Sequence, residues 1–190
     1  MMKRAILGAA IVSLAFVPST SQAQRRGASA QSPIKFSLAA GVAMPMSDFG
    51  DVVGTGFHVS GQGEKRLSGT PMFLRGELAA TLFGNKDIQN TGIKGSANQI
   101  AGMFDVGYNF VTTTSVKPYL VGGLGLHHSS MTMDFSDVGG DKASDSKDDL
   151  GINVGGGMRF KMGGRNASLE ARYIAAGDVK HLPIGLSVQF

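Results

Sequence analysis

The chain has 190 residues, no cysteine, and 18 basic against 14 acidic residues, giving a formal net charge of +4 at pH 7. This length fits one domain. Without cysteine, the chain has neither a disulfide framework nor the acylation site of a lipid-anchored protein.

The beginning of the chain has the features of an export signal. Lys3 and Arg4 precede an apolar run over residues 5–17, and small residues then lead to Ala23. The apolar run is shorter than the roughly 20 residues that a transmembrane helix requires, and glycine or polar residues interrupt every later stretch. The sequence therefore predicts a signal peptide over residues 1–23, cleaved between Ala23 and Gln24, and excludes a helical membrane protein.

Cleavage would leave a polar periplasmic lead-in, residues 24–33, and a folded domain, residues 34–190. It would also lower the excess of positive charge, since 18 basic residues less Lys3 and Arg4 leave 16 against 14 acidic residues. Nucleic-acid binding requires a concentrated basic face. We therefore expect no nucleic-acid partner.

Beyond residue 33, apolar residues alternate with small or polar ones in eight segments, as in strands that have one apolar face. Short connections alternate with longer polar ones, although the last of the long connections, 175–180, is itself small. An even strand number with short and long connections on opposite sides is typical of outer-membrane barrels. The sequence predicts an all-β fold, an eight-stranded antiparallel up-and-down transmembrane barrel. The expected strands are 35–42, 57–64, 72–82, 99–110, 117–128, 152–160, 168–173 and 182–190.

On all of these strands except 117–128, charged residues fall on one face only, opposite the stripe of Leu, Ile, Val and Phe. A soluble barrel would place apolar side chains inside and charges outside. Arg or Lys facing lipid costs about 2–4 kcal/mol at the membrane midplane. We therefore expect the apolar face to contact lipid and the charges to face the lumen. The charged residues are Lys35, Glu64, Arg75, Glu77, Asp105, Arg159, Glu170 and Arg172.

An eight-stranded barrel is only wide enough for side chains to fill it, so inward-facing charges must pair with one another. The sequence predicts a plugged polar lumen, and a minor channel for ions or small solutes is the alternative. The expected lumen charge network consists of Arg75, Glu77, Asp105, Arg159, Glu170 and Arg172.

Four segments carry a resemblance to a known family: KPYLVGGLGL (117–126), GINVGGGMRF (151–160), SLEARY (168–173) and LPIGLSVQF (182–190). The chain resembles the outer-membrane β-barrel domain family and is similar to the OmpA transmembrane domain and OmpX. The resemblance implies a location in the outer membrane, with lipids and lipopolysaccharide as partners. It also implies that Leu186, Val188 and Phe190 form the signal read by the barrel-assembly machinery. The sequence stops at Phe190, so we expect no peptidoglycan-binding domain and no cell-wall anchoring.

One pair of residues has the spacing of a catalytic site. His128 and Ser130 lie two apart at the boundary between an expected strand and the loop that follows it. Lipid A deacylases place a histidine and a serine two apart on a strand, so that the histidine can take the hydroxyl proton. No third residue that would orient the histidine is visible in the sequence. A lipid A-modifying enzyme is therefore an alternative function.

The longest expected loop, residues 129–149, holds six aspartates. Calcium prefers several oxygen ligands from one loop, but the spacing matches no EF-hand, and charged surface loops are usually solvated. We expect neither a metal site nor a cofactor. The expected function is a structural or surface-exposed role, in adhesion or envelope integrity, for a monomeric and non-enzymatic outer-membrane barrel.

Overall fold

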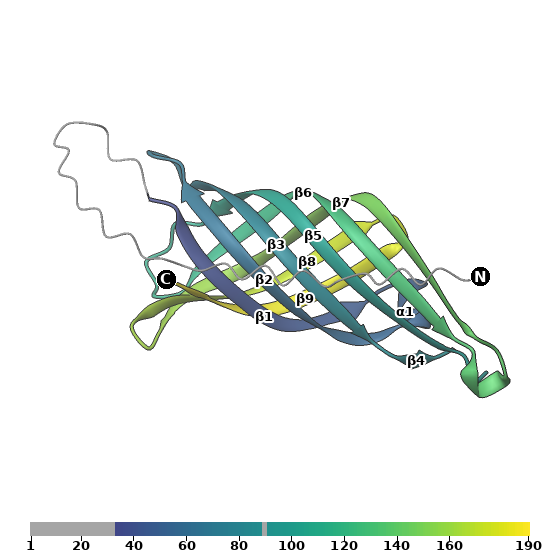
Figure 1. Ribbon diagram of the computed structural model, residues 1–190. Coiled ribbons are helices and arrows are strands. Elements are labelled where there is room, and N and C mark those ends of the chain that lie inside the picture. Colours follow the sequence, from purple (N-terminus) through teal and green to yellow (C-terminus); the bar gives the residue numbers. More distant parts are fainter. Residues whose placement is uncertain (1–32, 89–90) are drawn as a thin grey trace, which may run out of the picture. The chain divides into compact units, whose positions relative to one another are not determined.

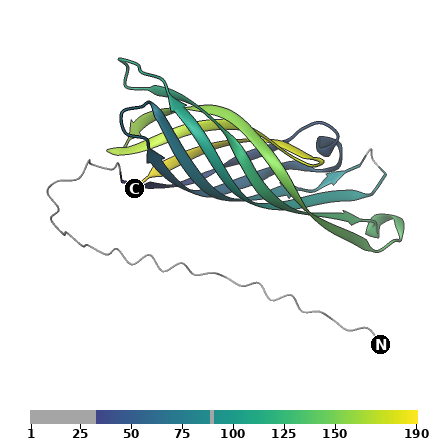
Figure 2. The same cartoon turned by 90° about the horizontal axis from the view of Figure 1, so that it is seen from above.

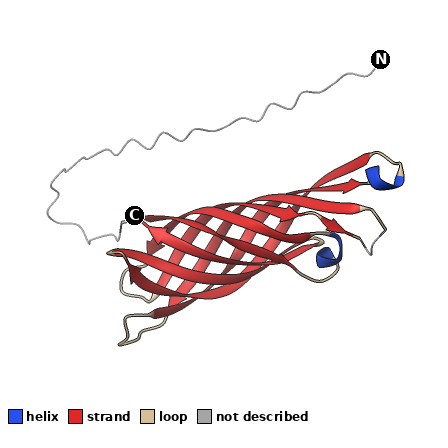
Figure 3. Cartoon of the chain, turned by 90° about the horizontal axis from the view of Figure 1, so that it is seen from below, coloured by secondary structure: helices blue, strands red, loops and turns tan. Residues whose placement is uncertain are grey.

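The computed structural model describes residues 33–88 and 91–190. The expected signal peptide, its cleavage site at Ala23 and Gln24, and nearly all of the expected lead-in lie outside the described residues. Strands dominate the described chain, with one short α-helix and one 3-10 turn (Figure 3). No helix in the described part is long and apolar enough to cross a membrane.

Within the described residues, eight long strands form one antiparallel sheet that closes on itself, because β1 pairs with β9 and β3 pairs with β5 (Figure 1). The predicted eight-stranded antiparallel barrel is confirmed. A two-residue strand, β4, adds to the end of β5. The bounds are β1 (Lys35–Pro45), α1 (Phe49–Val52), β2 (Gly54–Arg66), β3 (Met72–Gly84), β4 (Lys86–Asp87), β5 (Lys94–Asn109), β6 (Lys117–Asp134), η1 (Ser136–Val138), β7 (Lys142–Met162), β8 (Arg165–Ala176) and β9 (Val179–Gln189).

The two ends of the barrel differ in their connections. The short-turn end holds the connections 67–71, 110–116 and 163–164, together with the first residue of β1 and the last of β9. The long-loop end holds the connections 46–53, 85–93, 135–141 and 177–178. At this end the β6–β7 hairpin, with η1 at its tip, extends beyond the other connections (Figure 2).

The predicted sidedness of the strands is confirmed. On β3, Arg75 and Glu77 are each 3% exposed, whereas Leu78 is 74% exposed. The same alternation of buried polar and exposed apolar residues holds for Asp105 beside Val106 on β5. The outer surface of the sheet is therefore a continuous apolar band, and the ionic side chains lie inside.

Small residues on the inner face make room for large ones. A side chain at Gly107 would overlap the Phe73 ring, and one at Gly157 would overlap the Tyr119 phenol. Phe73 and Tyr119 are both almost fully buried in the lumen. Glycine at these inward positions is therefore required because a bulky neighbour fills the space next to it.

The expectation of a loop over residues 129–149 is wrong. β6 continues to Asp134 and β7 begins at Lys142, so only 135–141 connect them. Hydroxyl residues and opposite charges face one another across the hairpin, which stabilises strand pairing. The Thr132 and Ser144 hydroxyls lie 3.0 Å apart, and Lys142 Nζ lies 2.8 Å from Asp134 Oδ2.

Two other connections are also more structured than expected. The expected loop 175–180 is a two-residue turn, because β8 runs to Ala176 and β9 starts at Val179. The connection between the first two expected strands, 35–42 and 57–64, contains α1, whose Phe49 is buried. In each case residues that were assigned to a loop complete the inner or outer face of the barrel.

Candidate functional site

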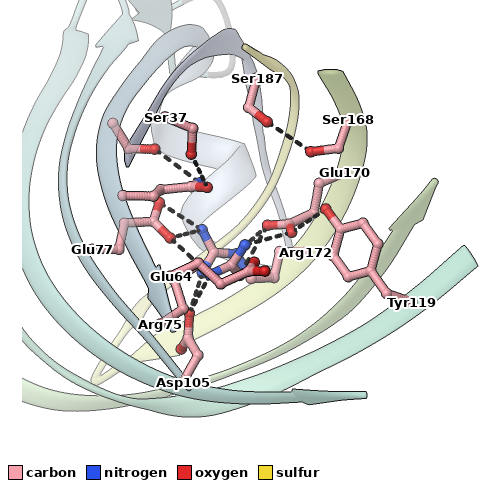
Figure 4. Close-up of polar contacts among 12 residues, drawn as sticks. Ser37, Glu64, Arg75, Glu77, Asp105, Tyr119, Ser168, Glu170, Arg172 and Ser187 are labelled. Carbon is pink, nitrogen blue, oxygen red and sulfur yellow. Dashed lines mark hydrogen bonds and ion pairs between the residues drawn. The ribbon is translucent and has the colours of Figure 1, made fainter. Parts of the chain in front are cut away.

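The middle of the lumen holds what we name the central ionic cluster: Arg75, Glu77, Asp105, Glu170 and Arg172 (Figure 4). Positions two apart on one strand point to the same side of a sheet. Strand β3 thus contributes two of these side chains, β8 two more, and β5 the aspartate. Five of the six residues of the expected lumen network therefore meet.

Each arginine of the cluster holds several carboxylates. Arg172 Nη2 donates to both carboxylate oxygens of Glu77 at 2.7 Å, and Arg172 Nη1 donates to Asp105 Oδ2 at 3.0 Å. Arg75 Nε donates to the same aspartate oxygen at 3.1 Å, and Arg75 Nη1 donates to Glu170 Oε2 at 2.7 Å. Such charge-assisted bonds are among the strongest in proteins. The cluster ties three strands together across the lumen.

Neutral side chains complete the hydrogen bonding of the carboxylates. The Tyr119 hydroxyl donates to Glu170 Oε2 at 2.6 Å, and the Asn153 amide donates to Asp105 Oδ1 at 2.8 Å. Two arginines face three carboxylates, so these neutral donors stabilise the extra negative charge. Buried charges require this kind of complete pairing.

The sixth expected residue, Arg159, lies outside the cluster. Its guanidinium donates two bonds of 2.7 Å to Glu64 and lies over the rings of Phe73 and Tyr119, 4.7 and 4.6 Å from their centroids. This stacked pair forms a second ionic layer. The Arg159–Glu64 pair joins residues 95 positions apart, so only the strand register reveals it.

Apolar side chains fill the lumen at the long-loop end. Helix α1 directs Phe49 inward, where its ring meets the Phe83 ring edge-on with centroids 4.9 Å apart. Val53 and Ala97 pack against them. Sequence reasoning missed this apolar cap because Pro45 and the glycines at 50 and 54 indicate a loop, although Phe is unusual in a solvated loop.

Three buried histidines also face the lumen. His58 Nδ1 lies 2.9 Å from the Thr81 hydroxyl and its Nε2 lies 4.0 Å from Glu77, so it touches the central cluster. His181 packs edge-on against the Phe83 ring of the cap. The ring nitrogens of His127 and His181 have no hydrogen-bond partner in the described structure. His127 is buried although the adjacent His128 is exposed, because strand alternation sends them to opposite faces.

The sequence matches the outer membrane protein beta-barrel domain family over residues 8–190. The chain belongs to this family. Its members are outer-membrane barrels, so the outer membrane is the location of this barrel and the short turns lie on the periplasmic side. No curated protein sequence matches the chain.

Solved structures with the same fold share little sequence with this outer-membrane barrel. The Neisserial surface protein A has 20% identity and a TM-score of 0.55, covering 82% of this chain and 95% of that one. A major outer membrane protein from Thermus thermophilus has 13% identity and a TM-score of 0.59, with 83% and 100% covered. Ail, the attachment invasion locus protein of Yersinia pestis, in complex with the heparin analogue sucrose octasulfate, has 19% identity and a TM-score of 0.51, with 83% and 99% covered.

On the outer face of the barrel, His128 and Ser130 project from β6 beyond the apolar band. His128 Nδ1 lies 2.7 Å from Asp148 Oδ1 on the adjacent strand β7. The sequence had shown no third residue to orient the histidine, and the register supplies one. His128 and Asp148 are both exposed. The described structure contains no hydrogen bond between His128 and Ser130.

Three of the six aspartates of the β6–β7 hairpin each pair with a single lysine. Asp134 pairs with Lys142, Asp137 with Lys94 at 2.8 Å, and Asp149 with Lys147 at 3.2 Å. Among the described residues, no three carboxylate or histidine groups converge as a metal site requires. The hairpin is therefore an ion-paired extension of the sheet.

We expect the tip of this hairpin to loosen in acid. The Lys142 ammonium, together with the Ser136 hydroxyl and backbone amide, lowers the pKa of the Asp134 carboxyl below its ordinary value. A carboxyl of this kind stabilises the fold above the ordinary pKa of about 3.9, and the contribution is lost as the pH falls towards its lower folded-state value. NMR order parameters of the amides 136–140 should stay constant from pH 7 to about 5 and fall below about pH 4.

The variant Asp134→Asn should show the loosened tip already at pH 7, because it cannot pair with Lys142. Asp145→Asn is the matched control, since Asp145 has no ion-pair partner within 4.0 Å among the described residues. Equal order parameters for the two variants would contradict the role of Asp134.

The residues of the expected assembly signal lie on the outer face of β9. Leu186 and Phe190 are exposed and Val188 is half-buried. The backbone amide of Phe190 donates to the carbonyl of Phe36 on β1, next to the seam where the barrel closes. Recognition of these residues by the barrel-assembly machinery stays a prediction.

Proposed function

We propose that this outer-membrane barrel is a monomeric, non-enzymatic protein with a structural or surface-exposed role, in adhesion or envelope integrity. In this proposal residues 1–23 direct export, and the barrel-assembly machinery reads Leu186, Val188 and Phe190. Lipids surround the apolar band, and the β6–β7 hairpin meets lipopolysaccharide and the cell exterior.

The filled lumen is the observation that carries the proposal. The apolar cap, the central ionic cluster and the Arg159–Glu64 pair follow one another along the barrel axis, and side chains occupy each layer. A cavity of about 240 Å³ lies at the short-turn end and one of about 290 Å³ lies beside Phe49 and Ala97 at the long-loop end. Between them, the space beside Glu170 and Arg172 measures only about 20 Å³. A conducting barrel requires a continuous water-filled path. The channel alternative is therefore less favoured.

Planar-bilayer recording tests the plugged lumen directly. The purified barrel should insert without conductance steps. Uniform steps that scale with salt concentration would replace this proposal with the minor channel.

Shortening the β6–β7 hairpin tests the surface role. A variant in which β6 and β7 are joined by a tight turn beyond the Leu126–Leu150 pair removes the projecting part and keeps the spanning strands. In a strain lacking the gene, the full chain should restore adhesion or resistance to detergent, and the shortened chain should not. Full restoration by a shortened barrel that keeps heat-modifiable gel mobility would contradict the surface role.

The contact between His128 and Asp148 favours one second candidate, an enzyme acting on lipids of the outer leaflet. In this arrangement Asp148 would orient the histidine and Ser130 would be the nucleophile. Lipid A extracted from cells with the full chain, with Ser130→Ala and without the protein should have the same acylation. Loss of an acyl chain that depends on Ser130 would establish the enzyme instead.

A further inference from the structure

The two ends of the barrel carry opposite charge. Ten of the 14 acidic residues lie at the long-loop end and three in the central ionic cluster, which leaves only Glu64 at the short-turn end. Cations dominate there. They are Lys35, Lys65, Arg66, Lys117, Arg159, Lys161 and Arg165.

The strand alternation directs most of these cations into the lumen. Lys35, Arg66, Lys117 and Lys161 share the inward face of their strands and line a cavity of about 240 Å³, which we name the short-turn vestibule. Lys65 and Arg165 belong to the outward face and are absent from its lining. Cations that served only to contact lipid headgroups would project outward. The inward cations therefore face the interior of the barrel at this mouth.

The inward cations have few partners of their own. Among the described residues, Lys35, Lys117 and Lys161 have no carboxylate within 4.0 Å, and Arg66 only reaches 4.0 Å from Glu64, which Arg159 already holds with two bonds. The vestibule thus carries a large excess of positive charge around one compensated carboxylate. Such a concave cationic site attracts anions.

The wall of the vestibule offers neutral hydrogen-bond donors beneath the rim. Ser37, Ser168 and Ser187 present hydroxyl groups, and Figure 4 shows the Ser168–Ser187 hydrogen bond of 2.6 Å that links β8 to β9. Asn166 and Gln62 add amide groups. Charged groups at the rim and neutral donors on the wall together suit a ligand with several anionic oxygens.

We propose that the short-turn vestibule binds a small multivalent anion, bearing carboxylate or phosphate groups, from the periplasm. Its volume equals that of about eight water molecules at roughly 30 Å³ each, which fits an anion the size of citrate or pyrophosphate and excludes a folded polymer. The Arg159–Glu64 layer and the central ionic cluster close its floor, so the ligand binds there and does not pass through.

Isothermal titration of the folded full chain in a zwitterionic detergent tests the proposal, with citrate and pyrophosphate as separate probes. The wild-type barrel should bind at least one of them, and the preferred probe identifies the carboxylate or the phosphate as the recognised group. The triple variant Lys35→Gln/Lys117→Gln/Lys161→Gln should bind at least about tenfold more weakly at low salt, and the difference should shrink at about 0.15 M salt.

The matched control is Lys65→Gln/Arg165→Gln/Lys180→Gln, which removes the same charge from positions outside the vestibule. It should keep its affinity within about twofold. Absence of binding by the wild type, or an equal loss in the control, would overturn the proposal. Heat-modifiable gel mobility verifies that each variant folds. If the triple variant does not fold, the single variant Lys117→Gln should weaken binding about two- to threefold. Unchanged binding by Lys117→Gln would also overturn the proposal.

Discussion

Replacing Arg172 by Ala should destabilise the barrel by about 3–5 kcal/mol, the cost of leaving a buried charge without its partner. Arg172 holds Glu77 with two bonds of 2.7 Å and also reaches Asp105 at 3.0 Å. Without it, three buried carboxylates share the single guanidinium of Arg75, and repulsion among them adds to the loss of hydrogen bonds. Urea unfolding in lipid vesicles, followed by far-UV circular dichroism and gel mobility, measures the change.

Arg165→Ala is the control on the same strand, because Arg165 is exposed, has no carboxylate within 4.0 Å among the described residues, and lies 5.5 Å from the centroid of the Phe190 ring. It should alter stability by less than about 0.5 kcal/mol. Adding Glu77→Gln to Arg172→Ala should recover part of the loss, since one of the unpaired carboxylates becomes neutral. A single variant Arg172→Ala as stable as wild type would contradict the view that the central ionic cluster holds the barrel together.

The sidedness of the strands could be predicted because each side chain in a strand has only two possible environments. Glu77 and Leu78 are adjacent, so they cannot both face lipid. The same holds for Asp105 and Val106. Repetition of this constraint along the chain fixes which face is inside. The number of strands and the polar lumen follow from the sequence for that reason.

The pairing between strands could not be predicted in the same way. Arg159 on β7 meets Glu64 on β2 across the lumen, although these two strands are not neighbours in the sheet. His128 meets Asp148 because of the register of the β6–β7 hairpin. Alternation says which face a residue occupies but not its height along the barrel. This is why the sequence placed Arg159 in the lumen without showing that its partner is Glu64, and why the partner of His128 was missed.

The β6–β7 hairpin was mistaken for a loop because its composition is that of a loop. Six aspartates and few large apolar residues indicate solvation, and beyond the membrane both faces of a strand are solvated. The apolar stripe that marks the spanning strands therefore ends at Leu126 and Leu150. Cross-strand ion pairs and hydroxyl contacts maintain the strands beyond that point, and these depend on the register.

Replacing Leu186 by Arg should prevent stable insertion or cost about 2–4 kcal/mol, the penalty for Arg on the lipid face near the midplane. Leu186 is 39% exposed on the outer face of β9, between Ala40 on β1 and Leu169 on β8. Leu186 lies beside the seam between β1 and β9. A guanidinium at this position must therefore either remain in lipid or disrupt the pairing of β9 with β1. The fraction of heat-modifiable barrel recovered after folding into vesicles measures the effect.

The next residue provides the matched comparison, because Ser187 faces the opposite way. Its hydroxyl lies 2.6 Å from the Ser168 hydroxyl beside the short-turn vestibule, where an amide has room and polar partners. Ser187→Asn should therefore fold normally and cost less than about 1 kcal/mol. Since the two positions are adjacent on one strand, they lie at nearly the same depth, and the comparison sets a charged group on the outer face against a neutral polar group on the inner face. If Leu186→Arg and Ser187→Asn folded equally well, the outer face of β9 would not be in contact with lipid.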